Sequence, residues 1–292
     1  MTQTIDPREC SWDVDGLTLA GLAWGPEDGT PILALHGWMD HAASFAELAP
    51  RLTGCHVVAL DLSGQGHSGH RAAHATYNIW DDLPQIADVI DQLGWADCVL
   101  LGHSRGANIS TLFAAAQPER VRALIALDSL VPEPSDPEAT VTTLRAFIEQ
   151  TRKMKARAPR TFPSRAAYVA RRQEQGNSRQ TSEALADRAL EAVAEGVRLR
   201  GDPRLFASSA VRLSQADVET VLRGLTCPVL NIWGDAGLLH KRDKAQGMVR
   251  LARDVIADYT CLEVAGDHHF HLDPDAAERI APAVLTFLAR VT

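Results

Sequence analysis

The segment GHSRG (102–106) places a serine between two glycines, directly after the apolar run CVLL (98–101). An apolar run that ends in closely spaced glycines and continues with small residues predicts a strand, a tight turn and the start of a helix. Such a turn exposes the Ser104 hydroxyl at the carboxyl edge of a sheet, near the positive end of the following helix. We therefore interpret Ser104 as the candidate nucleophile.

A serine hydroxyl attacks a carbonyl efficiently only when a base accepts its proton, and histidine is the usual base because its pKa lies near neutrality. The chain contains eleven histidines, and three of them occur in GDHHFHLDPD (266–275), between the last predicted strand and the last predicted helix. His268 leaves that strand first and is expected to reach Ser104. The other histidines near these two motifs are expected to be structural: His103, His269 and His271. No acidic or thiol ligand lies at a suitable spacing, so neither a metal nor another cofactor is expected.

Acyl transfer also requires hydrogen-bond donors for the negative oxygen that develops in the transition state. Where the nucleophile lies on a turn between a strand and a helix, these donors are two backbone N–H groups. One belongs to the residue after the nucleophile and the other to the loop after an early strand. The first is the N–H of Arg105. The second is the N–H of Trp38, in the segment ALHGWMD (34–40), which ends a buried run at the same edge of the predicted sheet.

A carboxylate would hold the imidazole in the orientation that accepts the serine proton. Two aspartates follow predicted strands that end at the same edge of the sheet as Ser104. Asp128 ends the run LIALD (124–128), and Asp235 follows NIWG (231–234). The residues alone leave both candidates open, because an aspartate after a strand also commonly stabilises a turn.

Short apolar runs of strand length alternate with segments of helical periodicity along most of the chain, which predicts a doubly wound, mostly parallel eight-stranded sheet with helices on both faces. The first 25 residues alternate in polarity around Asp15-Gly16, a strong hairpin signal. The expected buried strands are 32–37, 56–61, 98–104, 121–128, 228–234 and 260–266. The expected helices are 43–52, 79–93, 107–116, 244–256 and 275–289.

One segment, 132–225, interrupts this alternation. It contains no clear buried strand, and it has 16 Lys and Arg against 12 Asp and Glu, whereas the remaining chain has 13 against 25. This difference in charge predicts a helical insertion between two strands, with residues 1–131 and 226–292 forming the core domain.

The composition narrows the class of protein. At 292 residues, with 46% hydrophobic residues and a net charge of −8, the chain is expected to be globular and to bind no nucleic acid. No apolar run approaches the ~18 residues of a membrane span, and the first residues predict no secretory signal. Five scattered cysteines form no redox or zinc pair. We expect a cytoplasmic monomer or homodimer.

The motifs taken together resemble the α/β-hydrolase fold family. They occur in the family's order, as LHGWMDHAASF, DLSGQGHSG, GHSRGA, PVLNIWG and GDHHFHLDP, and the first is similar to the serine-hydrolase-like branch. The resemblance implies that the insertion between the sixth and seventh strands is a helical cap over the pocket. It also supports His268, because the family's histidine usually precedes an acidic residue by five, as His268 precedes Asp273.

The resemblance also bears on the acid. The family commonly places it three residues after the glycine that ends the seventh strand, and that position is Gly237 here. A branch of its haloalkane dehalogenases has the acid after the sixth strand and a glycine in the seventh-strand position, which implies Asp128, with Asp235 as the alternative. Dehalogenase and epoxide chemistry are disfavoured, because they require an aspartate nucleophile where this chain has Ser104.

These residues predict hydrolysis of a carboxylic ester or thioester with a small to medium acyl group, as in a carboxylesterase-like serine hydrolase. The alternatives are a hydrolase or lyase acting on a C–C bond, and a ligand receptor with a slow triad. Segment 145–212 has 15 basic and 7 acidic residues, which predicts an anionic substrate if the arginines face the pocket. Alternatively, the arginines form the solvated faces of amphipathic helices.

Overall fold

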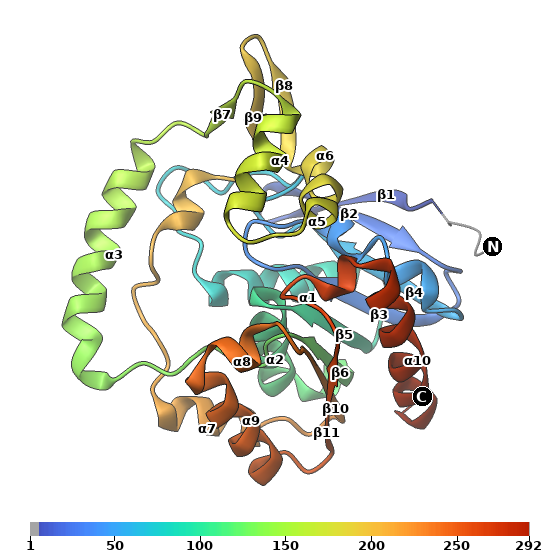
Figure 1. The fold of residues 1–292 in the computed structure, drawn as a ribbon. Coiled ribbons are helices and arrows are strands. Elements are labelled where there is room, and N and C mark those ends of the chain that lie inside the picture. The colour runs from blue at the N-terminus through green and yellow to red at the C-terminus, as the bar shows by residue number, and fades with distance from the viewer. Residues whose placement is uncertain (1–5, 292) are drawn as a thin grey trace.

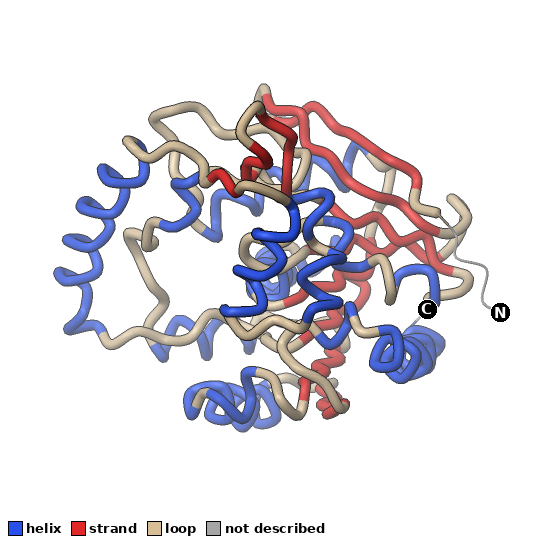
Figure 2. The backbone as a smooth tube through the Cα atoms, turned by 45° about the horizontal axis from the view of Figure 1, so that its top comes forward, coloured by secondary structure: helices blue, strands red, loops and turns tan. Residues whose placement is uncertain are grey.

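An eight-stranded sheet forms the centre of the computed structural model, which describes residues 6–291 (Figures 1 and 2). The strand order is β1-β2-β4-β3-β5-β6-β10-β11. The pairs β1–β2 and β2–β4 are antiparallel and the other five are parallel. The strands are β1 (Arg8–Val14), β2 (Leu17–Trp24), β3 (Thr30–Leu35), β4 (Cys55–Leu60), β5 (Cys98–His103), β6 (Val121–Leu127), β10 (Val229–Gly234) and β11 (Tyr259–Val264). This architecture confirms the predicted fold class.

The predicted hairpin joins β1 to β2. Asp15 and Gly16 both adopt positive φ, 53° and 70°, the conformation of a two-residue turn that matches the twist of the strands. Further along the chain, every residue of β4, β5 and β10 is buried. The sequences of these strands are mostly apolar because helices cover both faces of the sheet.

Two apolar clusters show how the helices divide between the two faces. One cluster contains side chains of α1 (Leu83–Gln92), α2 (Arg105–Ala116), α7 (Gln215–Arg223) and α9 (Asp243–Val255). The other contains side chains of α10 (Pro274–Val291) and two 3-10 helices, η1 (Ala42–Phe45) and η2 (Ala49–Arg51). The helix predicted over 43–52 is therefore wrong as a continuous α-helix. Pro50 lacks an N–H and its ring obstructs the preceding turn, so the chain forms two short 3-10 turns instead.

The segment between β6 and β10 is mostly helical, but it also contains a three-stranded antiparallel sheet of order β7-β9-β8 that the sequence did not predict. Its strands are β7 (Thr161–Phe162), β8 (Leu190–Val193) and β9 (Gly196–Leu199). The helices are α3 (Thr140–Lys155), α4 (Arg165–Glu174), α5 (Arg179–Ala184), α6 (Ala186–Ala189) and α7, with 3-10 turns η5 (Pro137–Ala139) and η6 (Pro203–Phe206). We call residues 132–225 the cap.

Part of the cap is fixed to the core by buried polar contacts. Arg188 of α6 donates to Asp61 at 2.7 Å, and His41 Nε2 donates to the Leu185 carbonyl at 2.8 Å. By contrast, α3 lies apart from α4–α6 (Figure 1), and Met154 is its one buried residue. In the described chain, residues 6–291, no helix is both long and apolar enough to cross a membrane.

Candidate active site

Ser104 occupies the sharp turn between β5 and α2, with φ 51° and ψ −115°. The two glycines of the motif permit this turn. A Cβ on Gly102 would lie 2.5 Å from Ala107 N, and one on Gly106 would lie 2.7 Å from the His36 carbonyl oxygen. A non-glycine residue with this φ stores strain on the order of 1–3 kcal/mol, which the packed strand and helix must offset. The turn holds the Ser104 hydroxyl at the edge of the sheet, as the sequence predicts.

The structure brings His268 and Asp128 to this serine. His268 Nε2 lies 3.0 Å from Ser104 Oγ, and His268 Nδ1 lies 2.6 Å from Asp128 Oδ2. The carboxylate is fully buried, whereas the imidazole is 28% exposed. Because a carboxylate accepts hydrogen bonds, this contact favours the tautomer with the proton on Nδ1, which leaves Nε2 free to accept the serine proton.

Two further hydrogen bonds fix the Asp128 carboxylate. Its Oδ1 accepts from Gly234 N at 3.1 Å and its Oδ2 accepts from Leu238 N at 2.9 Å. The carboxylate occupies space that a side chain at Gly237 would otherwise fill. A Cβ on Gly237 would lie 2.6 Å from both Cγ and Oδ2 of Asp128, and closer still to Oδ1. A carboxylate at Asp128 and a side chain at position 237 therefore exclude one another.

Asp235, the alternative acid, has a different partner. Its Oδ1 accepts from Gly266 N at 2.9 Å, and its side chain is exposed. This bond ties the loop after β10 to the loop after β11, which contains His268. The structure thus brings Asp128, and not Asp235, to the imidazole.

The two predicted oxyanion donors are Arg105, which follows Ser104 in the chain, and Trp38, which lines the same cavity as Ser104. Arg105 is the first residue of α2, so its N–H has no acceptor within the helix. Trp38 follows β3, and its indole Nε1 donates to the Leu205 carbonyl of the cap at 3.0 Å.

The Arg105 side chain is turned away from Ser104, towards Asp82. Its Nη2 donates to Asp82 Oδ2 at 2.9 Å, and the buried Asp82 also accepts from Arg71 at 3.0 Å. The guanidinium is therefore paired with a buried carboxylate and is not available as a free cation at the scissile bond.

Comparisons with known proteins identify the family of this chain. The family model described as the alpha/beta hydrolase fold matches residues 30–275. The chain belongs to the α/β-hydrolase fold family. A serine hydrolase-like protein of Dictyostelium discoideum is 30% identical to this hydrolase over 277 residues, which cover 90% of this chain and 76% of that protein. Serine hydrolase-like protein 2 of Homo sapiens is 28% identical, over 92% and 90% of the two chains. These relatives place the hydrolase in the serine-hydrolase-like branch that the motifs resemble.

Solved structures show the same fold. A hypothetical protein of Pseudomonas aeruginosa is 35% identical, with a TM-score of 0.89 over 96% of this hydrolase and 99% of that chain. The thioesterase domain from the curacin biosynthetic pathway is 25% identical, with a TM-score of 0.81 over 96% and 99%.

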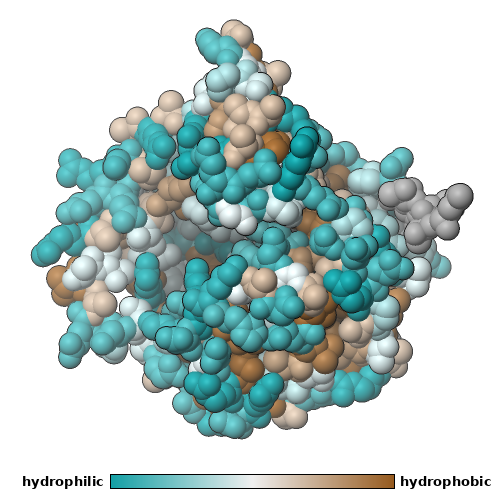
Figure 3. All heavy atoms as spheres, viewed as in Figure 1, coloured by the Kyte–Doolittle hydropathy of each residue, from teal (hydrophilic) through white to brown (hydrophobic). Residues whose placement is uncertain are grey.

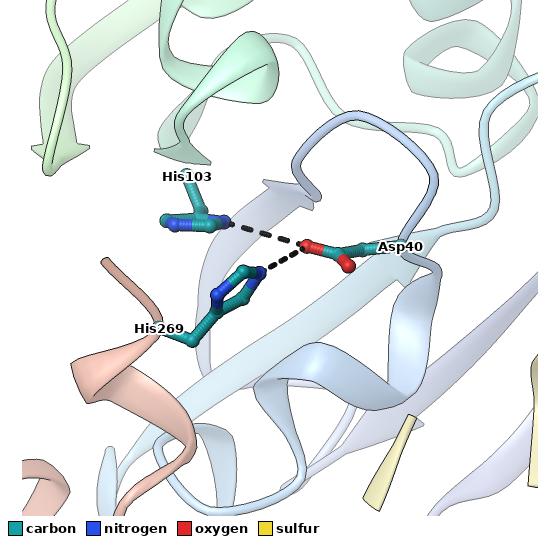
Figure 4. Close-up of side chains that lie close together, drawn as sticks. All are labelled: Asp40, His103 and His269. Atoms are coloured by element: carbon teal, nitrogen blue, oxygen red, sulfur yellow. Dashed lines mark hydrogen bonds and ion pairs between the residues drawn. The ribbon is translucent and has the colours of Figure 1, made fainter. Parts of the chain in front are cut away.

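A group of buried and half-buried polar side chains that the sequence did not predict lies next to the candidate active site of the hydrolase. Asp40 Oδ2 lies 3.1 Å from His269 Nε2 and 3.8 Å from His103 Nδ1 (Figure 4). Asp40 Oδ1 accepts from Arg172 of the cap at 3.4 Å. His103 Nε2 in turn donates to the backbone carbonyl of His268 at 2.7 Å. The group therefore connects the cap to the loop that holds the His268 imidazole.

The Asp40 carboxylate already has partners within this group. Burial opposes ionisation of Asp40, but His269 and Arg172 hold the pKa of its carboxyl well below the usual range. Burial lowers the pKa of His103 well below its ordinary value, so that ring is neutral. Asp40, His103 and His269 offer ligand atoms within 4.8 Å of one another. A cation there would compete with Arg172 for the carboxylate, so we assign these residues a positioning role.

A large cavity opens above Ser104 and His268. Its volume is about 1010 Å³, at the upper end of the range for small-molecule sites. Core loops form one side and the cap forms the other, and the surface is hollowed between α3 and the body of the hydrolase (Figure 3). Aromatic and apolar residues line part of it, among them Trp80, Phe162, Tyr168, Phe206, Trp233 and Met248.

Proposed function

We propose that this hydrolase cleaves a carboxylic ester or thioester of a small to medium acyl group through an acyl-enzyme. The observation that supports this is a chain of two hydrogen bonds, from Ser104 Oγ to His268 at 3.0 Å and from His268 to Asp128 at 2.6 Å. In this assignment Ser104 is the nucleophile, His268 the general base and acid, and Asp128 the group that orients the imidazole.

The reaction proceeds in two halves. Ser104 Oγ attacks the carbonyl carbon while His268 Nε2 takes its proton, and Asp128 stabilises the resulting imidazolium. The Trp38 and Arg105 N–H groups donate to the tetrahedral oxyanion, and each such donor contributes about 10²–10³ in rate. The intermediate collapses as His268 returns the proton to the departing alcohol or thiol. His268 then deprotonates a water molecule that attacks the acyl-enzyme. The bond between the acyl group and Ser104 Oγ breaks, His268 returns the proton to this oxygen, and the acid leaves.

Both leaving groups fit this chemistry, because an alcohol and a thiol each accept the proton from His268. The likeness to a thioesterase domain supports including thioesters. Other relatives are named epoxide hydrolase 4, in Mus musculus and Homo sapiens, but the similarity covers 41% and 39% of this chain. The serine at position 104 favours acyl transfer over that chemistry.

The proposal is tested by turnover of short-chain nitrophenyl esters and acyl thioesters, together with covalent labelling by a fluorophosphonate. Ser104→Ala should abolish labelling and reduce turnover to the uncatalysed background. Ser11→Ala, an exposed serine on the edge strand β1, is the matched control and should behave as wild type. Wild-type protein that neither labels nor exceeds the Ser104→Ala background would refute the proposal and favour a receptor or a C–C-cleaving enzyme.

A further inference from the structure

The wall of the active-site cavity contains more positive than negative side chains. Its carboxylates are engaged: Asp40 pairs with Arg172, Glu133 pairs with Arg242 at 2.9 Å, and Asp267 accepts from His269 N at 2.7 Å. Four cations of the wall have no carboxylate within ion-pair distance among residues 6–291, namely Arg157, Arg160, Arg212 and Lys241. We call these four residues the cationic rim.

The members of the rim converge from separate parts of the chain. Arg157 and Arg160 lie between α3 and β7, Arg212 lies between η6 and α7, and Lys241 ends α8 (Leu238–Lys241). The three arginines are in irregular segments, so they are not the outward faces of amphipathic helices. The Arg160 side chain packs on Phe162, another residue of the cavity wall, with its guanidinium carbon 4.9 Å from the centre of the ring. The fold thus gathers unpaired charge at one cavity.

This local charge contrasts with that of the protein as a whole, whose net charge is −8. A cleft of one sign concentrates oppositely charged ligands and raises their rate of association. The cation nearest to Ser104 in sequence, Arg105, is already paired with Asp82. An anion would therefore bind away from the scissile carbonyl, in the part of the cavity that a small acyl group leaves unfilled.

We propose that the substrate has an anionic group, a carboxylate or a phosphate, separated from the scissile carbonyl and bound by the cationic rim. The inference rests on the proposed function, because it assigns a substrate class to the same site. Two sources supply this chemistry: a carboxylate at the far end of the acyl group, or phosphates on the thiol half of a thioester.

Matched substrates separate these sources. The first pair is the nitrophenyl monoester of glutarate and its methyl-capped neutral analogue. The second is acetyl-coenzyme A and acetyl-N-acetylcysteamine, which lacks the phosphates. We expect kcat/KM to be about tenfold higher for the anionic member of at least one pair, and to fall towards the neutral value as salt shortens the range of the attraction. Preference in the first pair places the anion in the acyl group, and preference in the second places it in the thiol half.

Rim variants supply the structural test. Each of three rim variants should raise KM for the preferred anionic substrate about twofold to fivefold: Arg157→Gln, Arg160→Gln and Arg212→Gln. Their kcat for that substrate and their kcat/KM for the neutral analogue should stay as in wild type. Arg152→Gln is the matched control, because it removes the same charge from a position on α3 that is exposed, like the rim arginines, but lies outside the cavity wall. Equal turnover within both pairs, or equal effects of rim and control variants, would overturn the inference while leaving ester hydrolysis intact.

A binding measurement separates failure of the inference from failure of the proposed function. Titration calorimetry of the Ser104→Ala protein with glutarate or coenzyme A requires no turnover. Salt-sensitive binding of either compound that weakens in the rim variants supports the rim whatever the reaction is. Absence of binding by both compounds would refute it.

Discussion

Replacing Gly237 by alanine tests the reason why the acid of the proposed triad lies on Asp128. The backbone at Gly237 has φ −86° and ψ −156°, a conformation that alanine adopts without strain. The substitution therefore acts through the added methyl group alone. That Cβ would lie 2.6 Å from Asp128 Cγ, about 1 Å inside the ordinary contact distance between carbon atoms.

The expected effect follows from how far the carboxylate must move. A shift of about 1 Å would disrupt the 2.6 Å contact between Asp128 Oδ2 and His268 Nδ1. Misplacing a catalytic group by 1 Å costs on the order of 10² in rate, and complete loss of the acid's orienting role costs about 10⁴ in a well-studied serine protease. We expect kcat/KM to fall by about 10²–10⁴, with a loss of about 1–3 kcal/mol in the free energy of unfolding from overpacking.

The assay is nitrophenyl ester turnover, with urea unfolding as the measure of stability. Gly247→Ala is the control, because a Cβ there meets only the end of the Arg250 side chain, at 3.9 Å. In an Asp128→Ala background the clash partner is gone, so Gly237→Ala should have little further effect. A Gly237→Ala enzyme with near wild-type turnover, or with a full loss also in the Asp128→Ala background, would refute the reasoning.

Two further predictions follow from the structure. Asp128→Asn should lower kcat by about 10²–10⁴ while Asp235→Asn stays within a few-fold of wild type, and comparable losses in ester turnover would contradict the assignment. Burial lowers the pKa of His41 to about 4 and of His271 to about 3. As the pH decreases below about 6.5, these histidines become protonated in the unfolded chain before they do in the folded one. The free energy of unfolding should therefore decrease by up to about 1.4 kcal/mol for each histidine per unit decrease in pH. Urea unfolding between about pH 7.5 and 5 measures this slope, and an unchanged slope in His271→Gln would refute it.

The nucleophile turn could be predicted from the sequence because its determinants are local. Gly102, Ser104 and Gly106 are neighbours in the chain, and the sharp φ of the turn and its close contacts tolerate only such spacing. The hairpin at Asp15-Gly16 is similar, since both residues favour the positive φ that its turn requires. Local sterics restrict the chain at these places regardless of what packs around it.

The cap and the polar group at Asp40 could not be predicted in this way. β7 is two residues long and pairs with β9, more than thirty residues later in the chain, and so short a segment has no detectable periodicity. Asp40 becomes informative only when its distant partners, His269 and Arg172, are known. A buried polar group is stabilised by whatever satisfies its hydrogen bonds, and those partners come from other elements.

The motifs of the chain were enough to predict the candidate nucleophile, the histidine loop and the edge of the sheet at which they meet, but they left two aspartates as candidates. β6 and β10 are adjacent and parallel, so Asp128 and Asp235 leave the sheet at the same edge. Which of the two contacts His268 became clear from the folded arrangement. Asp235 bonds to Gly266 N, whereas Asp128 fills the space that Gly237 leaves open. The choice depends on the register of the strands and on the space left because Gly237 has no side chain. Both depend on how distant segments pack together, which the sequence does not reveal.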